Sequence, residues 1–264
     1  MPFPGGLMDN SKIWEGSGIL REIRPLLDGV FLLEVEAPEV TSRAHPGEFV
    51  LLRVSPSWDP FLFRPLGIAG ISGDRMVLLV QVVGRGTALL QTLSSGTAVT
   101  LRGPLGRGFS EPKKEKRYLL AAGGLGVVPL LYAYRQWGGA VPMELLLGVP
   151  DASWAPLGAY LRQFVPDLRV VSDDGSLGER GNPCICIRGS WDEVWACGPL
   201  PMLRGFYECL PGDVPYFPSL EARMGCGYGG CLGCVVPTTE GNLRACVEGP
   251  VMDGRKVLWH ELCK

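Results

Sequence analysis

The first half of the chain alternates short apolar runs with turn residues. The breaks between the runs are Asp28-Gly29, Pro46-Gly47 and Ser72-Gly73-Asp74. Apolar runs of this length between such breaks are typical of antiparallel β-strands. We therefore predict an antiparallel β-barrel or sandwich with one short helix at 87–93. The expected strands are Ile19 to Ile23, Val30 to Val35, Phe49 to Val54, Met76 to Val83 and Ala98 to Leu101.

A different pattern begins after the polar stretch Glu111 to Lys116. Tyr118 to Ala122 is a continuous apolar run, and the apolar segment Val127 to Trp137 has the length of a helix. Strand and helix patterns then alternate, which predicts a parallel α/β sheet with ligands at the carboxyl ends of its strands. The further expected strands are Met143 to Leu147, Leu168 to Val171 and Glu193 to Cys197, with helices at Ala155 to Phe164 and Met202 to Leu210.

The chain after Pro211 shows little periodicity and is organised around cysteines. A segment of this size cannot bury a core alone, and we expect a bound metal or cluster to hold it together. The prediction is thus a multi-domain chain: an antiparallel β-barrel at 11–112, a parallel α/β domain at 113–210 and a small segment at 211–264.

Composition supports two compact domains with an appendage. The chain has 264 residues, of which 46% are hydrophobic. Its 25 Lys and Arg balance 27 Asp and Glu, which argues against a nucleic-acid surface. No apolar run approaches the roughly 18 residues of a membrane span, and Met1 to Ser11 shows no signal-peptide pattern. We expect a cytoplasmic protein that binds neither nucleic acid nor membranes.

The strongest chemical signal is a group of four cysteines. Cys226, Cys231 and Cys234 are followed after eleven residues by Cys246, a C-x4-C-x2-C-x11-C arrangement. The first three match the spacing of plant-type [2Fe-2S] proteins. Gly225, Gly227, Gly229, Gly230 and Gly233 remove side chains, so that backbone N–H groups can approach the sulfur atoms.

A structural zinc site is the alternative for these thiols. Zinc sites usually pair two short cysteine knuckles, and the gap before Cys246 leaves the second knuckle incomplete, so we favour the cluster. We expect the other cysteines to be ordinary thiols and the two histidines, His45 and His260, to be surface or turn residues. These other cysteines are Cys184, Cys186, Cys209 and Cys263, apart from Cys197, which is considered below.

A second set of residues, in the β-rich half, suits a pyrophosphate. Arg64-Pro65-Leu66-Gly67 lies near an expected strand, and Gly84-Arg85-Gly86-Thr87 enters the expected helix. An arginine can pair with phosphate oxygens, and a Gly-Thr helix start offers N–H groups and a hydroxyl. A surface turn and a plain helix cap are the alternatives for each motif alone.

A third set lies at strand ends of the α/β half. Gly123, Gly124 and Gly126 follow the first strand; they lack the G-x-G-x-x-G pattern but open a helix start to a pyrophosphate, a tight packing turn being the alternative. Cys197-Gly198-Pro199 ends another strand, where a small thiol fits beside a nicotinamide ring. The acidic pair Asp173-Asp174 favours NADH over NADPH.

These motifs, in this order, resemble the ferredoxin-reductase superfamily and most closely the electron-transfer subunits of class 1B dihydroorotate dehydrogenases. The most specific stretch runs from Ser219 to Cys234, together with 172–176 and 197–199. The resemblance implies an FAD-binding barrel, an NAD-binding α/β domain and a [2Fe-2S] segment. It also implies FAD contacts at Arg64, Pro65, Leu66, Gly67, Leu79, Val80, Gln81, Gly86 and Thr87, and cluster ligation by the four cysteines.

Two positions depart from this family. Gly67 stands where Ser or Thr is usual, and Gln81 where a basic residue is usual. The resemblance further implies a partner, an FMN-containing catalytic subunit that oxidises dihydroorotate in pyrimidine biosynthesis, in a heterotetramer of two copies of each chain. Hydride exchange between nicotinamide and flavin needs positioning and no general base, so we assign no catalytic residue.

Two alternatives remain open. The chain is also compatible with the flavin subunit of a ferredoxin-dependent NAD(P)H oxidoreductase, although the early fourth cysteine favours the first assignment. A binding module stabilised by zinc, without redox function, is the alternative from another class.

Overall fold

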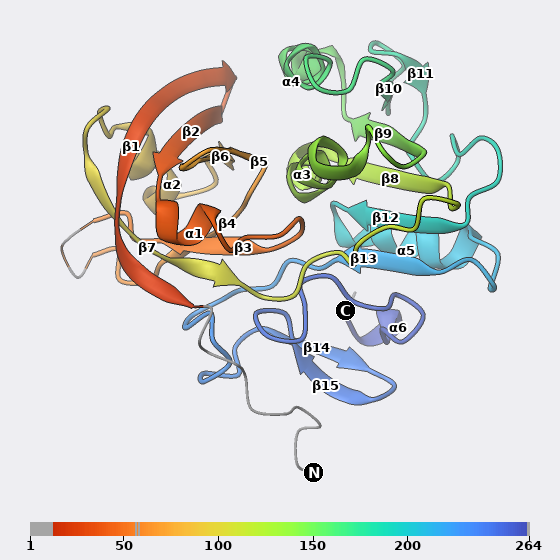
Figure 1. Ribbon diagram of the computed structural model, residues 1–264. Coiled ribbons are helices and arrows are strands. Elements are labelled where there is room, and N and C mark those ends of the chain that lie inside the picture. Colours follow the sequence, from red (N-terminus) through yellow and green to blue (C-terminus); the bar gives the residue numbers. More distant parts are fainter. Residues whose placement is uncertain (1–12, 56, 58, 263–264) are drawn as a thin grey trace.

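The computed structural model describes residues 13–55, 57 and 59–262. A curved antiparallel sheet forms one side of the molecule, a parallel sheet with helices forms the other, and the C-terminal segment lies below both (Figure 1). Residues 11 and 12 of the expected barrel unit, the N-terminal stretch Met1 to Ser11 and Cys263 lie outside the described residues.

The antiparallel sheet has seven strands in the order β4-β3-β7-β1-β2-β6-β5. Its edge strands β4 and β5 are separated in sequence only by Ile68 and Ala69, so the sheet curls back on itself as a barrel does. Two short helices accompany it. The bounds are β1 Trp14–Leu27, β2 Val30–Glu36, α1 Pro38–Thr41, β3 Phe49–Leu52, β4 Arg64–Gly67, β5 Gly70–Ser72, β6 Arg75–Gln81, α2 Arg85–Gln91 and β7 Ala98–Leu105.

All five expected strands and the short helix are present in this half, with shifted ends. Strand β1 is longer than expected, and the helix begins at Arg85. Strands β4 and β5 were not expected, because β4 contains a proline and both carry glycine, residues that weaken a strand pattern. Strand β4 is nonetheless an edge strand, where proline is tolerated.

The second sheet has six strands in the order β11-β10-β9-β8-β12-β13, and all of its pairings are parallel. Its strands are β8 Tyr118–Gly123, β9 Met143–Val149, β10 Arg169–Ser172, β11 Glu179–Arg180, β12 Glu193–Cys197 and β13 Tyr216–Ser219. The helical segments are η2 Gly124–Gly126, α3 Val127–Trp137, η3 Ala152–Trp154, α4 Ala155–Leu161 and α5 Leu200–Cys209.

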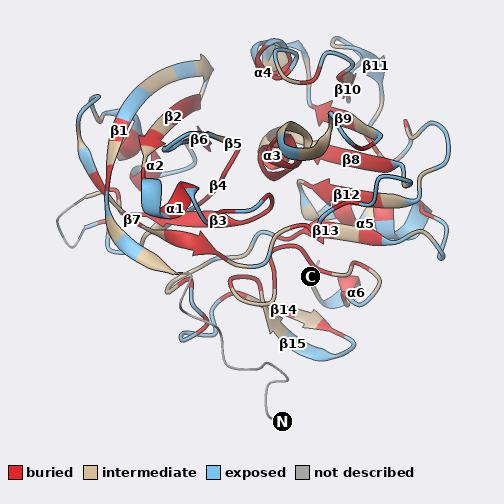
Figure 2. Cartoon of the chain, viewed as in Figure 1, coloured by how far each residue is buried: buried red, intermediate tan, exposed pale blue. Residues whose placement is uncertain are grey.

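Helices cover both faces of this sheet. Leu120 of β8 packs in one apolar cluster with α3 and α4, whereas its neighbour Leu119 packs in another with α5. Alternate side chains of a strand point to opposite faces, so a strand covered on both sides is apolar throughout. Strand β8 accordingly is buried along most of its length (Figure 2).

The parallel sheet extends beyond residue 210. Strand β13 pairs with β12, with Val194 opposite Tyr216 and Cys197 opposite Ser219. We expected no strand after Pro211. The strand is only four residues long and contains Pro218, so its periodicity is too weak to identify. It carries the chain from the α/β domain directly to the cysteines.

The C-terminal segment contains one hairpin and one short helix. Strands β14 Val235–Thr238 and β15 Gly241–Arg244 pair antiparallel, and α6 spans Trp259–Leu262. Buried Cys234 and Cys246 belong to the same apolar cluster as Leu51 of the barrel and Phe206 of α5. The segment is therefore packed against both other parts. Within the described residues, none of the helices is long and apolar enough to cross a membrane.

Candidate functional site

A cavity of about 480 Å³ lies between the barrel and the α/β part, a size typical of small-molecule sites. Strands β4 and β6 and the start of α2 line one side, and the start of α3 and the ends of β12 and β13 line the other. Cys197 lines the cavity, and so do all nine residues expected at FAD. These nine are Arg64, Pro65, Leu66, Gly67, Leu79, Val80, Gln81, Gly86 and Thr87.

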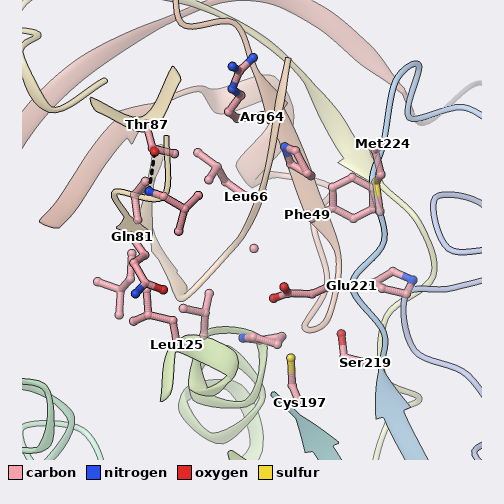
Figure 3. A pocket seen from close by; sticks show the side chains of 18 of the residues that line it. Phe49, Arg64, Leu66, Gln81, Thr87, Leu125, Cys197, Ser219, Glu221 and Met224 are labelled. Carbon is pink, nitrogen blue, oxygen red and sulfur yellow. Dashed lines mark hydrogen bonds between the residues drawn. The ribbon is translucent and has the colours of Figure 1, made fainter. Parts of the chain in front are cut away.

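Arg64 lies directly over the first turn of α2. A Cβ atom added to Gly86 would be 2.2 Å from Nε of Arg64, so only glycine leaves room for the guanidinium there. The Thr87 hydroxyl accepts a hydrogen bond from the Val83 N–H at 3.0 Å (Figure 3). It also donates to the Gly84 carbonyl at 3.0 Å. Thr87 thus caps its own helix while lining the cavity.

The opposite wall contains polar residues that the sequence patterns did not identify as site residues. Ser219, at the end of β13, and Glu221 line the cavity beside Cys197, and the Glu221 carboxylate points into it (Figure 3). Although Glu221 is exposed at the edge of the cavity, partial desolvation of its carboxylate raises its pKa. Burial likewise raises the pKa of Cys197, which therefore remains a neutral thiol. Cys197 is distant in sequence from Ser219 and Glu221. The pairing of β13 with β12 brings them together, so no sequence pattern could show that they share a site.

The remaining residues expected at NAD lie together behind this wall. A Cβ atom on Gly126 would be 2.2 Å from the carbonyl oxygen of Cys197, and one on Gly123 would be 2.7 Å from Cδ of Pro199. The glycines therefore permit close packing between the ends of β8 and β12, as the packing-turn alternative requires. Gly124 adopts a positive φ of 53°, and the cavity lining includes Leu125 between these glycines.

The acidic pair lies after β10, at the same edge of the parallel sheet. The Asp174 carboxylate accepts hydrogen bonds from the N–H and the hydroxyl of Ser176 at 2.9 and 2.7 Å, and these bonds lower its pKa. Asp173 is exposed. Both residues are thus exposed, and the Asp174 carboxylate is hydrogen bonded within a turn.

The four cysteines expected to hold a cluster, Cys226, Cys231, Cys234 and Cys246, lie as two interacting pairs. The Cys231 N–H donates to Sγ of Cys226 at 3.4 Å. Burial alone would raise the pKa of Cys226, but hydrogen bonds from the backbone N–H groups of Tyr228 and Cys231 lower it to about 7. In the second pair, a hydrogen bond from Cys246 lowers the pKa of Cys234 to about 6 and raises that of Cys246.

The two pairs also lie near each other, since the charge of Cys226 contributes to the raised pKa of Cys246. Within the described residues, no three His, Cys, Asp or Glu side chains are placed around one point for a single metal ion. A [2Fe-2S] centre takes two cysteines at each of two irons, which two thiol pairs fit. Gly225 and Gly233 lie beside Cys231, since a Cβ atom on either would be in ordinary contact with its Sγ, at 3.4 or 3.5 Å.

The cavity wall and the loop that contains the first three cysteines, residues 226–234 (the cysteine loop), belong to one continuous segment. Ser219 to Ala222 and Met224 line the cavity, and Cys226 follows two residues later. Two residues of extended chain span at most about 7 Å. A group held by Cys226 is therefore close to anything bound in the cavity.

The other described thiols and the two histidines do not line the cavity. Cys184 donates to the Met202 carbonyl at 3.3 Å, and Cys186 is buried. Cys209 is exposed at the end of α5. His45 and His260 are both exposed, as expected of surface or turn residues.

Comparison with known proteins identifies relatives of this chain. Residues 221–258 match the family described as the iron-sulfur cluster binding domain of dihydroorotate dehydrogenase B. A protein of Desulforamulus reducens named dihydroorotate dehydrogenase B (NAD(+)), electron transfer subunit, is 35% identical over 242 residues, covering 87% of this chain and 92% of its own. The protein of that name from Geobacillus kaustophilus is 34% identical, covering 89% and 95%.

Solved structures share the fold. The structure of an NADH-dependent reduced ferredoxin-NADP oxidoreductase, studied for flavin-based electron bifurcation, superposes with a TM-score of 0.79 at 26% identity, covering 93% of this chain and 91% of that one. A ferredoxin NADP+ reductase of Neisseria gonorrhoeae with bound FAD and NADP has a TM-score of 0.62 at 14% identity, covering 74% and 89%. The second likeness concerns the fold alone.

Proposed function

This chain belongs to the family of electron transfer subunits of dihydroorotate dehydrogenase B, and on that premise we propose that it passes electrons from a dihydroorotate-oxidising partner subunit to NAD+. The observation that carries the proposal is the continuous segment 219–226, which joins the wall of the cavity to the cysteine loop. When bound, FAD would exchange hydride with NAD and single electrons with a [2Fe-2S] cluster.

The chain's own residues would hold these groups. Arg64 and the start of α2 suit a pyrophosphate, because a guanidinium and backbone N–H groups converge there. The apolar side chains of Leu66, Leu79 and Val80 suit a flavin ring, since most of the cavity lining is apolar. We propose FAD contacts at all nine cavity residues named above, and cluster ligation by Cys226, Cys231, Cys234 and Cys246.

We propose that NAD approaches from the carboxyl ends of β8 and β12. Cys197 is the one member of that group that lines the cavity, so it would lie where nicotinamide meets flavin. The contact residues proposed for NAD are Gly123, Gly124, Gly126, Cys197, Gly198 and Pro199. Exposed Asp173 would favour NADH, because a carboxylate repels a 2′-phosphate.

The partner would dock beside the cysteine loop. Tyr228 and Leu232 of that loop are 47% and 44% exposed, and Phe61 and Leu62 are 62% and 49% exposed. Arg102 lies between the rings of Phe63 and Tyr228, which places the two loops side by side. Exposed apolar side chains gathered in this way mark a protein interface. We propose that an FMN-containing catalytic subunit binds here in the cytoplasm, with two copies of each chain in the complex.

The test is reconstitution of the native complex. The chain, co-expressed with a dihydroorotate-oxidising subunit and purified anaerobically, is expected to reduce NAD+ when dihydroorotate is added. It should carry one FAD and about two irons per chain with acid-labile sulfide. A colourless chain that contains zinc and no sulfide would contradict the cluster and support the zinc-stabilised module.

A second function has support from one observation. The NADH-dependent ferredoxin-NADP oxidoreductase structure covers nearly the whole chain. If the purified chain instead reduces ferredoxin from NADH or NADPH, and shows no activity with a dihydroorotate-oxidising subunit, this second function is correct. Both functions use the same cavity and cysteine loop, so the choice of partner separates them.

A further inference from the structure

The cysteine loop is attached to the barrel through one arginine of β7. Arg102 lies opposite Glu15 of β1 and Leu51 of β3 in the antiparallel register. Its side chain is only 18% exposed although it lies on the outside of the sheet, because the cysteine loop covers it. The contact joins two parts of the molecule that are 124 residues apart in sequence.

Four interactions hold the guanidinium of Arg102. One terminal nitrogen donates to the carbonyl oxygen of Cys226 at 2.6 Å. Its Nε donates to the Glu15 carboxylate, also at 2.6 Å. The ring centroids of Phe63 and Tyr228 lie 5.1 and 5.2 Å from its central carbon, one from the barrel and one from the cysteine loop. The planar group is thus fixed in position and in orientation.

The residue between Cys226 and Tyr228 also lies against the barrel. Gly227 has a positive φ of 79°, and a Cβ atom there would be 2.5 Å from Cδ1 of Leu51. Three consecutive loop residues therefore contact the barrel. Cys226 accepts a hydrogen bond from Arg102, Gly227 packs closely against Leu51, and the Tyr228 ring makes a cation–π contact with Arg102. A shift of Arg102 would move the first cluster cysteine relative to the cavity.

We propose that Arg102 is a positioning residue that holds the Cys226 loop against the flavin barrel and raises the midpoint potential of the cluster bound there. The inference rests on the proposed function, since it concerns the same cysteine loop. A cluster held by four thiolates becomes more negative on reduction, and a fixed cation nearby stabilises the reduced state. Glu15 opposes this effect, because its carboxylate partly neutralises the guanidinium.

The experiment measures the midpoint potential of the purified chain loaded with FAD and cluster, by redox titration followed by electron paramagnetic resonance. Arg102→Gln is expected to shift the reduction equilibrium about tenfold toward the oxidised cluster, about 59 mV for a one-electron couple. Glu15→Gln is expected to shift it the other way. Arg102→Lys, which keeps the charge but not the planar fork, should restore most of the potential while altering the spectrum of the reduced cluster.

Arg21→Gln is the matched control. Arg21 is also a strand arginine paired with a glutamate, Glu36, but it lies on β1 and its described contacts include no residue of the cysteine loop. The potential should therefore not change. An Arg102→Gln chain with full iron content and unchanged potential would overturn the inference.

If the Arg102→Gln chain loses iron, its potential cannot be measured, and Glu15→Gln becomes the test because that variant keeps the arginine. A higher cluster potential in Glu15→Gln would support the inference, and an unchanged potential would overturn it. Wild-type protein without acid-labile sulfide would instead mean that the proposed function itself fails.

Discussion

Val128 of α3 packs against Gly67 of β4 at the wall of the cavity, so that a Cβ atom added to Gly67 would lie 3.1 Å from Cγ1 of Val128. Gly67 stands where the resemblance leads us to expect a hydroxyl side chain. The space beside that position is thus taken by an apolar group of the other half of the molecule. A side chain at position 67 would therefore compete with Val128 for this space.

Restoring the hydroxyl should therefore depend on residue 128. Gly67→Ser alone is expected to lower the free energy of unfolding by about 1 kcal/mol or more through overpacking. In a Val128→Ala background the same substitution should cost less, with a favourable coupling of at least about 0.5 kcal/mol. Denaturant unfolding of the four chains gives this coupling, and strictly additive costs would show that the two residues are independent.

Arg64 should contribute strongly to FAD retention. Arg64→Ala is expected to weaken FAD binding by on the order of 1.5 to 3 kcal/mol, the range for a hydrogen bond to a charged group. Gly86→Ala should weaken it as well, because the new methyl group displaces the guanidinium. Equilibrium dialysis of FAD measures both. Arg43→Ala, which removes an exposed arginine paired with Glu39 on α1, is the control, and equal FAD affinity of Arg64→Ala and control would remove Arg64 from the pyrophosphate site.

Removal of one exposed cysteine of the proposed cluster site should separate the two proposed redox groups. Cys231→Ser is expected to lose most of the roughly two irons per chain while keeping FAD and its reduction by NADH, since Cys231 does not line the cavity. Iron analysis and the flavin absorbance spectrum measure the result. Cys209→Ser, at another exposed thiol, should leave iron and FAD unchanged. Loss of FAD before iron in Cys231→Ser would contradict our division of the chain.

Glu221 should make stability depend on pH. Although Glu221 is exposed, partial desolvation of its carboxylate beside the cavity raises its pKa in the folded chain above the ordinary value of 4.5. The folded state then holds the proton more tightly than the unfolded state, so stability is greatest below the ordinary pKa and falls as pH rises through the folded pKa. Glu221→Gln carries no charge and should melt at a higher temperature than wild type at pH 7, a gain that disappears below about pH 4.5.

Thermal unfolding at a series of pH values tests this. Glu39→Gln, at an exposed carboxylate on α1, should change stability by no more than about 0.5 kcal/mol. A melting difference between wild type and Glu221→Gln that is constant over pH would show that desolvation of the Glu221 carboxylate is not its cause.

Tyr132 should stabilise the contact between α3 and the barrel. Its buried hydroxyl donates to the Ala44 carbonyl at 2.9 Å, and burial raises its pKa to about 12. Tyr132→Phe leaves that carbonyl without its donor and is expected to cost about 1 to 3 kcal/mol of unfolding free energy. Denaturant unfolding followed by tryptophan fluorescence measures the loss, and a cost near zero would mean that water replaces the hydroxyl.

The local patterns were sufficient for most of the architecture. The fold class is confirmed: apolar runs between turn residues form the antiparallel half, and strands alternating with helices form the parallel half. Both signals come from residues within one turn or one strand of each other, and such short-range signals are legible in a single sequence. The cysteine spacing is likewise local, and the match of residues 221–258 to an iron-sulfur domain agrees with it.

Only the three-dimensional structure determined which residues from distant parts of the sequence contact one another. Strand β13 was missed because four residues with a proline carry little periodicity, and with it the cavity positions of Ser219 and Glu221. The contact of Arg102 with Cys226 joins residues that no spacing rule connects. Secondary structure follows from near neighbours, whereas a site follows from pairing between distant strands, whose free energy depends on the whole packed core.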